Sequence, residues 1–143
     1  ECGAPADAIN REMFDMKSRA RLEIERQALA GIRFAFGDRC AVMTITRKMI
    51  SDAGAAEGDL EGLAPLPRQI EGVWVGVTMR EKEDGRYKVS LRTGTHADAS
   101  KICARLGGGG HVCAAGCTVS GSAQEAVDTV LSAIAAELPE ITA

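Results

Sequence analysis

The 143-residue sequence has few aromatic residues, few histidines and no large excess of charge. Aromatic side chains make up 3% of the chain, and the formal net charge is −3. Proteins that bind nucleic acid over a broad surface rely on clustered basic residues and on aromatic rings that stack against bases. The composition therefore argues against such a surface, and any anionic ligand has to be captured at a local site.

Long apolar runs and a disulfide pattern are missing as well. No run approaches the roughly 20 apolar residues of a membrane-spanning helix, and the chain does not open with a basic segment followed by an apolar one. The five cysteines are odd in number and scattered, which is not typical of a disulfide framework. With 45% hydrophobic and 26% charged residues, the composition is that of a globular domain with its own core. We therefore expect a cytoplasmic protein that does not contact a membrane.

The spacing of the hydrophobic residues predicts an α/β fold, a mixed β-sheet with flanking helices that is preceded by a long N-terminal connector helix. This helix is expected from Pro5 to Leu29, with Gly31 ending it. Hairpins are expected where short apolar stretches flank a turn, at residues 32–47 and 73–94. Further expected elements are a short helix closed by Gly54, a helix over 98–107 with Asp98 as N-cap, a strand over 116–121 and a final helix over 122–138 with a Ser122–Glu125 capping box.

Four consecutive glycines lie in the stretch RLGGGGHVCAAGCTV, residues 105–119. They stand between a capped helix and an apolar strand, without the serine, proline or charge of a flexible linker. We therefore expect Gly107–Gly110 to form an ordered loop that leads into a helical turn, because glycine lets another group approach the backbone closely. Ordered glycine loops of this kind typically bind phosphate through backbone N–H groups.

Two common phosphate-binding motifs are absent from this stretch. There is no Gly-Lys-Ser/Thr, which excludes a P-loop, and Val112 and Cys113 stand where a dinucleotide-binding motif has its third glycine. His111 follows the glycines directly and offers a donor for a phosphate oxygen or a ribose hydroxyl. The small residues at 114–116 allow the loop to pack tightly on its neighbours.

The stretch GGGGHVCAAG resembles the signature of the C-terminal DHH-associated domain of the DHH phosphoesterases, a glycine run followed by His, two variable residues and Ala-Ala-Gly. The resemblance extends through RQIEGVWVGVTMREKEDGRYKVSLRTG and DASKICARL, and it is strongest to bacterial nano-RNases, pAp phosphatases and cyclic-dinucleotide phosphodiesterases. The segment APADAINREMFDMKSRARLEIE is similar to the last helices of the family's DHH domain. This resemblance implies that residues 1–31 are the end of a DHH domain and the connector helix, and that residues 32–143 are the DHH-associated, substrate-binding domain.

The resemblance also implies a binding site. It assigns the substrate's phosphate or sugar to Gly108, Gly109, Gly110 and His111, with Arg92 facing the same phosphate. Arg92 has a physical argument of its own, since a guanidinium at a strand end beside a glycine loop can bind phosphate through two parallel hydrogen bonds. An exposed arginine without a ligand is the alternative for this residue. Weaker candidates, for which a surface or structural role is an equally good interpretation, are Arg68, Arg80 and Ser90.

In the family that the chain resembles, the DHH domain holds two metal ions, usually manganese, and the associated domain binds the substrate. This chain has neither an Asp-His-His triplet nor adjacent histidines, so we predict no catalytic residue and no metal ligand in it. We expect the substrate-binding part of a phosphoesterase, inactive alone. Its expected partners are a DHH domain in cis and a short oligonucleotide, pAp or a cyclic dinucleotide, and a second copy of the chain is a further candidate.

Four alternatives stay open at this point. A structural or dimerising module binds no ligand, and a nucleic-acid-binding appendage resembles the related domain of alanyl-tRNA synthetases. His96 and Asp98 form a superficial metal pair, although Asp98 serves better as a helix cap. A zinc site needs four ligands, and the available set is Cys103, His111, Cys113 and Cys117. We favour ordinary packing of buried cysteines over this site.

Overall fold

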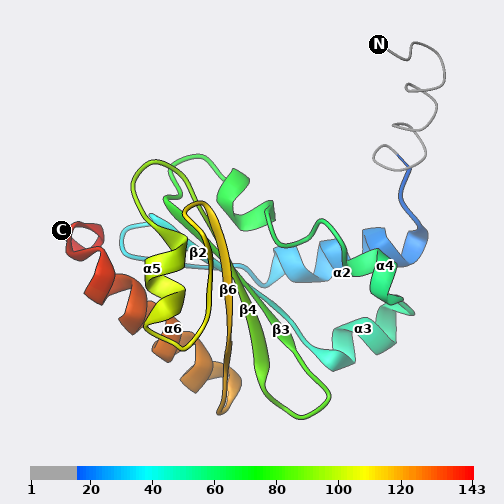
Figure 1. Ribbon diagram of the computed structural model, residues 1–143. Helices are drawn as coiled ribbons and strands as arrows, with labels where there is room; N and C mark the ends of the chain where they lie inside the picture. Colours follow the sequence, from blue (N-terminus) through cyan, green and yellow to red (C-terminus); the bar gives the residue numbers. More distant parts are fainter. Residues whose placement is uncertain (1–15) are drawn as a thin grey trace, which may run out of the picture.

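A six-stranded β-sheet organises residues 16–143, the part of the chain that the computed structural model describes (Figure 1). The strand order is β1-β2-β3-β4-β6-β5, with β2 and β3 parallel and the other neighbouring strands antiparallel. The predicted mixed sheet with flanking helices is therefore confirmed. The elements are α2 (Arg19–Ala30), β1 (Arg33–Ala35), β2 (Cys40–Ile45), α3 (Arg47–Ala53), α4 (Glu57–Leu60), the 3-10 helix η2 (Leu66–Gln69), β3 (Val75–Glu81), β4 (Tyr87–Thr93), α5 (Ala99–Ala104), β5 (Gly109–His111), β6 (Ala114–Val119), α6 (Ala123–Glu137) and the 3-10 helix η3 (Pro139–Thr142).

Local signals set most element boundaries where we expected them. Asp98 accepts a hydrogen bond from the Lys101 N–H and caps α5, and Ser122 and Glu125 form the reciprocal capping box of α6. Gly54 adopts the left-handed conformation that closes α3, with φ 65°. The hairpins β1–β2 and β3–β4 form as predicted.

Within the described residues, the predicted connector helix is present as α2, which begins later than the sequence pattern predicts. Residues 5–15 of the predicted helix lie outside the described residues, and within the described part α2 begins only at Arg19. Ser18 has extended backbone angles, and its hydroxyl accepts from the Arg21 N–H at 2.9 Å while donating to Asp59 at 2.6 Å. Ser18 is therefore the N-cap, which ends the helix on its N-terminal side. Gly31 closes the other end, as predicted.

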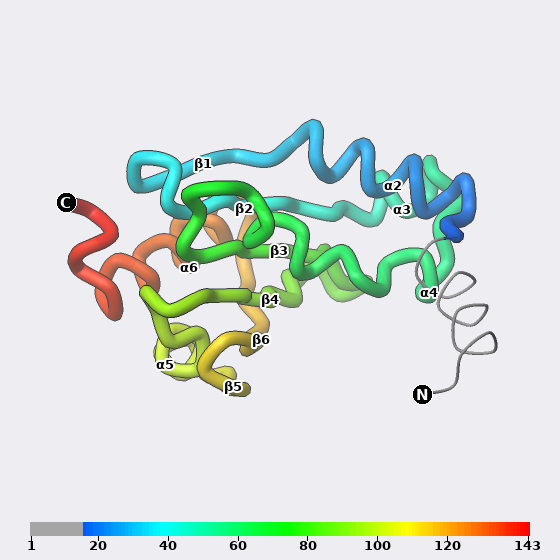
Figure 2. Tube along the Cα trace, turned by 90° about the horizontal axis from the view of Figure 1, so that it is seen from above, coloured from blue at the N-terminus to red at the C-terminus, as the bar shows by residue number. Residues whose placement is uncertain are grey.

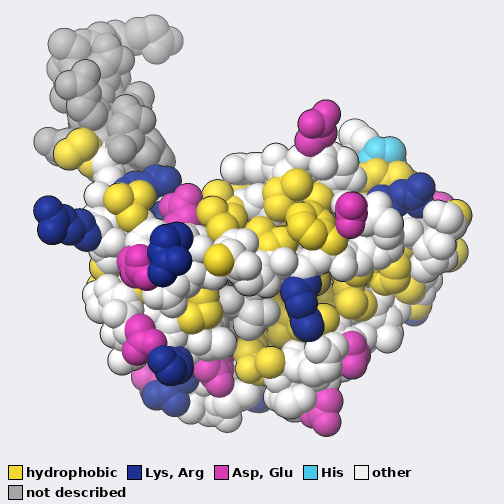
Figure 3. All heavy atoms as spheres, turned by 180° about the vertical axis from the view of Figure 1, so that it is seen from behind, with side chains coloured by type: hydrophobic (Ala, Val, Ile, Leu, Met, Phe, Trp, Pro, Cys, Tyr) yellow, Lys and Arg dark blue, Asp and Glu magenta, His cyan; other side chains and the backbone are white. Residues whose placement is uncertain are grey.

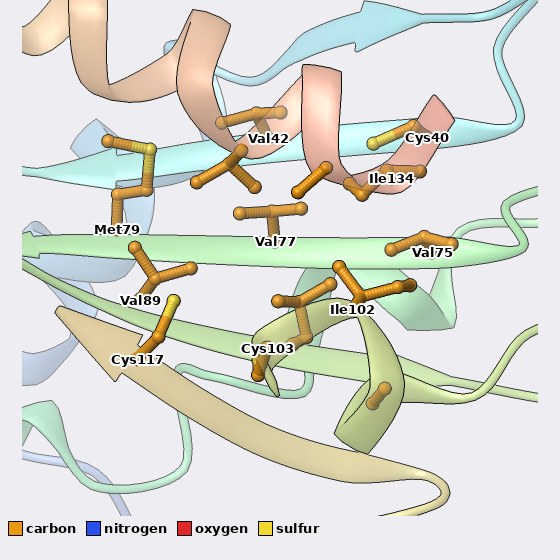
Figure 4. Close-up of a cluster of buried hydrophobic side chains, with 14 of the residues drawn as sticks. Cys40, Val42, Val75, Val77, Met79, Val89, Ile102, Cys103, Cys117 and Ile134 are labelled. Atoms are coloured by element: carbon orange, nitrogen blue, oxygen red, sulfur yellow. The ribbon is translucent and has the colours of Figure 1, made fainter. Parts of the chain in front are cut away.

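One face of the sheet carries the larger hydrophobic core. Figure 4 shows its side chains meeting between the strands and the helices α5 and α6, and they include Val42, Val75, Val77, Val89, Ile102, Cys103, Cys117 and Ile134. The members that lie on strands alternate with residues that point to the opposite face, because strands have a period of two, and Ile102, Cys103 and Ile134 come from the covering helices. Burying one such aliphatic side chain contributes roughly 1.5–3 kcal/mol, so this core fixes the register of the strands.

The opposite face is covered only over part of its width. Ile24 and Ala28 of α2 pack with Met43, Ile45 and Leu63 in a second buried cluster over β2. Seen from above, α2, α3 and α4 lie together on this side of the sheet, and β4, β6 and β5 extend beyond them (Figure 2). Within residues 16–143, no helix has the length and apolar character needed to cross a membrane.

Candidate functional site

The pairing register gathers polar residues of several strands on the uncovered face of the sheet. Arg92 pairs with Ala114, which in turn pairs with His111, and Ser90 pairs with Gly116, the partner of Gly109. Cross-strand partners point to the same side of a sheet, and none of the residues in these two rows is fully buried. We call this surface the open face, and its members are Arg80, Lys88, Ser90, Arg92, Gly109, His111, Ala114 and Gly116.

A hollow of about 280 Å³ lies on the open face and contains three of the predicted site residues. Arg80, Ser90 and Arg92 line it from the strands, together with Lys88. The chain segment 60–64 lines the opposite wall, where the Ala64 carbonyl accepts a hydrogen bond from the Thr78 hydroxyl at 3.1 Å. The structure therefore brings Arg80, Ser90 and Arg92 together in one hollow, which the predicted site residues Gly108–His111 do not line.

Arg92 keeps most of its hydrogen-bonding capacity. Its guanidinium Nη1 donates to the Leu91 carbonyl at 3.1 Å, and among the described residues it makes no ion pair with a carboxylate. A guanidinium carries five N–H donors, so several remain for a ligand. The half-buried position of Arg92 limits competition from bulk solvent.

Arg68 reaches the same region from η2. Its backbone lies directly on Gly76, where an added Cβ would approach the Arg68 nitrogen to 2.5 Å, and its guanidinium lies against Gly94. Gly76 pairs with Arg92 across the β3–β4 ladder, so the two arginines belong to neighbouring positions of one surface. The Arg68 Nε is buried and has no hydrogen-bond partner among the described residues. A buried donor without a partner costs free energy, which an anionic ligand would recover.

Arg80 is held by a carboxylate. Its two terminal nitrogens donate to Glu57 of α4 at 2.7 and 2.6 Å, a bidentate pair that lowers the pKa of the Glu57 carboxyl. Sequence reasoning identified Arg80 but not Glu57, because the two residues are far apart in the sequence. It also missed Lys88, although the alternation Lys88, Ser90, Arg92 along β4 places all three on one face.

The glycine run is ordered, but it does not lead into a helical turn. The N–H groups of Gly107 and Gly108 donate to the Ala104 and Cys103 carbonyls at 3.2 and 2.9 Å and so terminate α5. The next three residues form the edge strand β5 against β6. The prediction of a helical turn was wrong, because pairing with the small residues of β6 determines the conformation instead.

The glycines of this run differ in what surrounds them. A Cβ on Gly108 would collide with the Gly116 carbonyl and with Cys117, and one on Gly110, where φ is 150°, would lie 2.6 Å from the Ala115 Cα. These two glycines are needed for the close packing of β5 on β6. Gly109 is different, since nothing lies within 4 Å of the place of its missing Cβ and it faces the open side.

This difference predicts that two alanine substitutions change stability by very different amounts. Gly108→Ala should lower the free energy of unfolding by about 2–4 kcal/mol, because the obstructing atoms belong to backbone that cannot move aside. Gly109→Ala should change it by less than about 0.5 kcal/mol, as for an ordinary surface substitution. Urea denaturation of both variants measures the difference. Equal stabilities would contradict the described packing of β5.

The two histidines have separate surroundings. His111 is exposed on β5, in the same cross-strand row as Arg92. His96 stacks on Trp74 with ring centroids 4.3 Å apart, and the guanidinium carbon Cζ of Arg39 lies 4.7 Å from the centroid of the Trp74 ring. Asp98 is used as the cap of α5, so the His96–Asp98 metal pair has no support.

The residues of the zinc alternative do not form a common site. Cys103 and Cys117 belong to the buried core, whereas His111 and Cys113 are exposed. The neighbouring Cys117 sulfur and burial raise the pKa of the Cys103 thiol well above its usual range, and zinc is bound by thiolates. In the described part of the chain, no three His, Cys, Asp or Glu residues form a group that could hold a metal ion. Ordinary core packing explains the two buried cysteines.

Comparison with known proteins identifies the family. The sequence model of the DHHA1 domain family matches residues 37–140. The chain belongs to the DHHA1 domain family. Among curated proteins, this chain is 40% identical over 113 residues to the bifunctional oligoribonuclease and PAP phosphatase NrnA of Thermus thermophilus. The match covers 78% of this chain and 33% of that protein. The chain thus spans about a third of that relative's length.

Two solved structures resemble this DHHA1 chain. An exopolyphosphatase-related protein from Bacteroides fragilis superposes with a TM-score of 0.86 at 25% identity, covering 96% of this chain and 41% of that one. The pGpG-specific phosphodiesterase PggH from Vibrio cholerae gives a TM-score of 0.60 at 12% identity, covering 94% and 44%. The second likeness establishes a shared fold only. The sequence-based resemblance to DHH-family phosphoesterases is therefore confirmed.

Proposed function

We propose that this chain is the substrate-binding part of a metal-dependent phosphoesterase that hydrolyses short oligonucleotides, pAp or cyclic dinucleotides. Residues 32–143 form the binding domain in this proposal, and residues 1–31 connect it to a DHH domain in cis. The relationship to NrnA, whose name records oligoribonuclease and PAP phosphatase activities, supports this substrate class. A cytoplasmic location remains part of the proposal.

The observation that carries the proposal is the register of β4, β6 and β5. It places the Arg92 guanidinium, the Ser90 hydroxyl and the His111 imidazole on one uncovered face. Ser90 and Arg92 line the hollow on this face, and His111 lies in the row of Arg92 on the far side of β6, so charged and neutral donors for phosphate oxygens share one surface. The Arg68 Nε, buried and without a partner among the described residues, adds a donor that a bound phosphate would satisfy.

The backbone of the glycine run contributes a limited part of the site. The N–H groups of Gly107 and Gly108 already donate to carbonyls of α5. We therefore propose that only the backbone N–H groups of Gly109–His111 donate to the phosphate. Gly109 has no side chain on the open side, so a ligand can approach the strand there at van der Waals distance. Gly108 and Gly110 then act by holding β5 in place.

The proposed reaction needs a metal centre that the described residues cannot build. Residues 16–143 contain no group of three candidate ligands, so they do not fit the two-metal site of the family. We therefore place manganese and the catalytic groups in the DHH domain. The role of this chain is to bind and orient the phosphate end of the substrate.

Catalytic silence of the chain alone tests this division of roles. Incubated with pAp or a dinucleotide and manganese, the purified chain should release no phosphate and no mononucleotide, because residues 16–143 contain no cluster of ligands for two metal ions. Release is measured by chromatography of the products. Manganese-dependent turnover that is lost in Arg92→Ala but survives His96→Ala would show a catalytic centre within this chain and contradict the proposal.

A structural or dimerising role is the second candidate, and exposed apolar side chains on α2 favour it. Leu22 and Leu29 are 53% and 41% exposed. Seen from behind, the molecule shows apolar side chains in several patches among charged ones (Figure 3). Sedimentation together with a phosphate titration separates the two candidates, since a purely structural module associates without binding phosphate.

A further inference from the structure

The ion pair between Glu57 and Arg80 stands at the boundary of two hollows. The hollow of about 280 Å³ on the open face contains Ser90 and Arg92. A second hollow of about 1040 Å³ extends between α3 and the β3–β4 turn. Both hollows are lined by Glu57, Arg80 and Lys88, so the ion pair separates them.

The geometry of this pair is one that a phosphate can reproduce. Two carboxylate oxygens of Glu57 accept from the two terminal nitrogens of Arg80 at 2.7 and 2.6 Å. Carboxylate and phosphate oxygens bind a guanidinium in the same bidentate way. Glu57 therefore occupies on Arg80 the position that an anionic ligand in the smaller hollow would take.

The pair is also easy to open. The Glu57 side chain is 76% exposed and extends from the four-residue helix α4, while that of Arg80 is 31% exposed. Exposed pairs of this kind contribute little free energy. Lys88, the cross-strand partner of Arg80, also lowers the pKa of the Glu57 carboxyl, so the displaced carboxylate keeps a cation nearby.

We propose that Glu57 is a specificity-determining residue that competes with the substrate for Arg80. A terminal phosphate, which carries about 1.5–2 negative charges at neutral pH, displaces the carboxylate and gains Arg80. An internal phosphodiester carries a single charge and leaves the pair closed. This inference rests on the proposed function, because it requires that phosphate binds on the open face.

Three other acidic residues line the larger hollow with Arg80, and none of them pairs with it. Glu81 accepts a hydrogen bond at 2.8 Å from the N–H of Arg47, the first residue of α3. Asp84 pairs with Arg86 in the β3–β4 turn. Glu83 lines the larger hollow but forms no ion pair within residues 16–143, which makes it a matched control.

The experiment compares adenosine monophosphate with the dinucleoside monophosphate ApA, which has an internal phosphodiester only. In Glu57→Gln, AMP should bind about two- to fivefold more tightly, since the exposed pair no longer has to open. ApA should gain more, because Arg80 becomes available to it, and the preference for AMP should fall. Glu57→Ala should act in the same direction, and Glu83→Gln should leave both affinities unchanged.

A double-mutant cycle completes the test. In the Arg80→Gln background, Glu57→Gln should have no further effect on AMP affinity, because the competitor has lost its target. Unchanged or weaker AMP binding in both Glu57 variants would overturn the inference. The same holds if the variants lose stability, seen as a lower unfolding midpoint, without binding AMP more tightly. If AMP binding to the unmodified chain depends on Arg92 but the Glu57 variants have the same AMP affinity as the unmodified chain, the proposed function stands and this inference alone fails. If the unmodified chain does not bind AMP, both fail.

Discussion

Replacing Arg92 with alanine is expected to weaken nucleoside monophosphate binding about ten- to a hundredfold. Charge-assisted hydrogen bonds contribute roughly 1.5–3 kcal/mol each, and about 1.4 kcal/mol corresponds to one decade of affinity. Arg92 makes one hydrogen bond to a neighbouring carbonyl and no carboxylate pair among the described residues, so its loss removes ligand contacts rather than structural ones. NMR titration with AMP measures the effect even where binding is weak.

Two further variants make this result specific. Arg92→Lys keeps the charge but loses the planar pair of donors, so it should recover only part of the affinity. Arg86→Ala removes an arginine at the far end of the same hairpin, where the side chain pairs with Asp84, and should leave binding unchanged. If Arg86→Ala weakened AMP binding as much as Arg92→Ala, general charge rather than the open face would explain the affinity.

Gly109→Val is expected to have the largest effect on binding, a loss of more than about a hundredfold, with little change in stability. Nothing lies within 4 Å of the missing Cβ of Gly109, and valine is a favourable strand residue, so the fold should tolerate the substitution. The new side chain would project from the open face in the cross-strand row of Gly116 and Ser90 and occupy the space that we assign to the phosphate. Calorimetric titration and urea denaturation of the same sample give both quantities.

The controls for this prediction lie on the same strand. Gly109→Ala adds a single methyl group and should weaken binding less than Gly109→Val does. Normal AMP affinity in a folded Gly109→Val variant would mean that the phosphate binds elsewhere. A large loss of stability in that variant would instead contradict the open space described beside Gly109.

Local sequence signals predicted much of the fold. Asp98, Ser122 and Gly54 cap helices through contacts within a few residues, so their roles follow from sequence spacing alone. The β3–β4 hairpin follows in the same way from alternation and an Asp-Gly turn. In each case the interaction that fixes the conformation joins residues that are close together in the sequence.

The two wrong predictions concern interactions that are not local. Ser18 caps the N-terminus of α2 and is bonded to Asp59, which is 41 residues away, and the periodic pattern of the sequence does not contain that information. Glycine is depleted in strands, so nothing local indicates that Gly109 and Gly110 form β5. Their conformation depends on pairing with the small residues Ala115 and Gly116 of β6.

The candidate site also contains residues that local sequence signals predict and contacts that they do not predict. Ser90 and Arg92 follow from strand alternation and from the family motif, and the register then places them with Gly109 and His111. The orphaned Nε of Arg68 and the pair between Arg80 and Glu57 arise from tertiary packing of η2 and α4 on the sheet. No spacing rule within the sequence reports those contacts.

The most direct test of phosphate binding on the open face follows the backbone amide signals of residues 107–111 during an AMP titration. We predict that the amides of Gly109, Gly110 and His111 shift together with those of Ser90 and Arg92. Gly107 and Gly108 should respond less, because their N–H groups are bonded to α5. If the amides of 109–111 do not respond while others shift, the glycines serve packing alone and the open face is not the phosphate site.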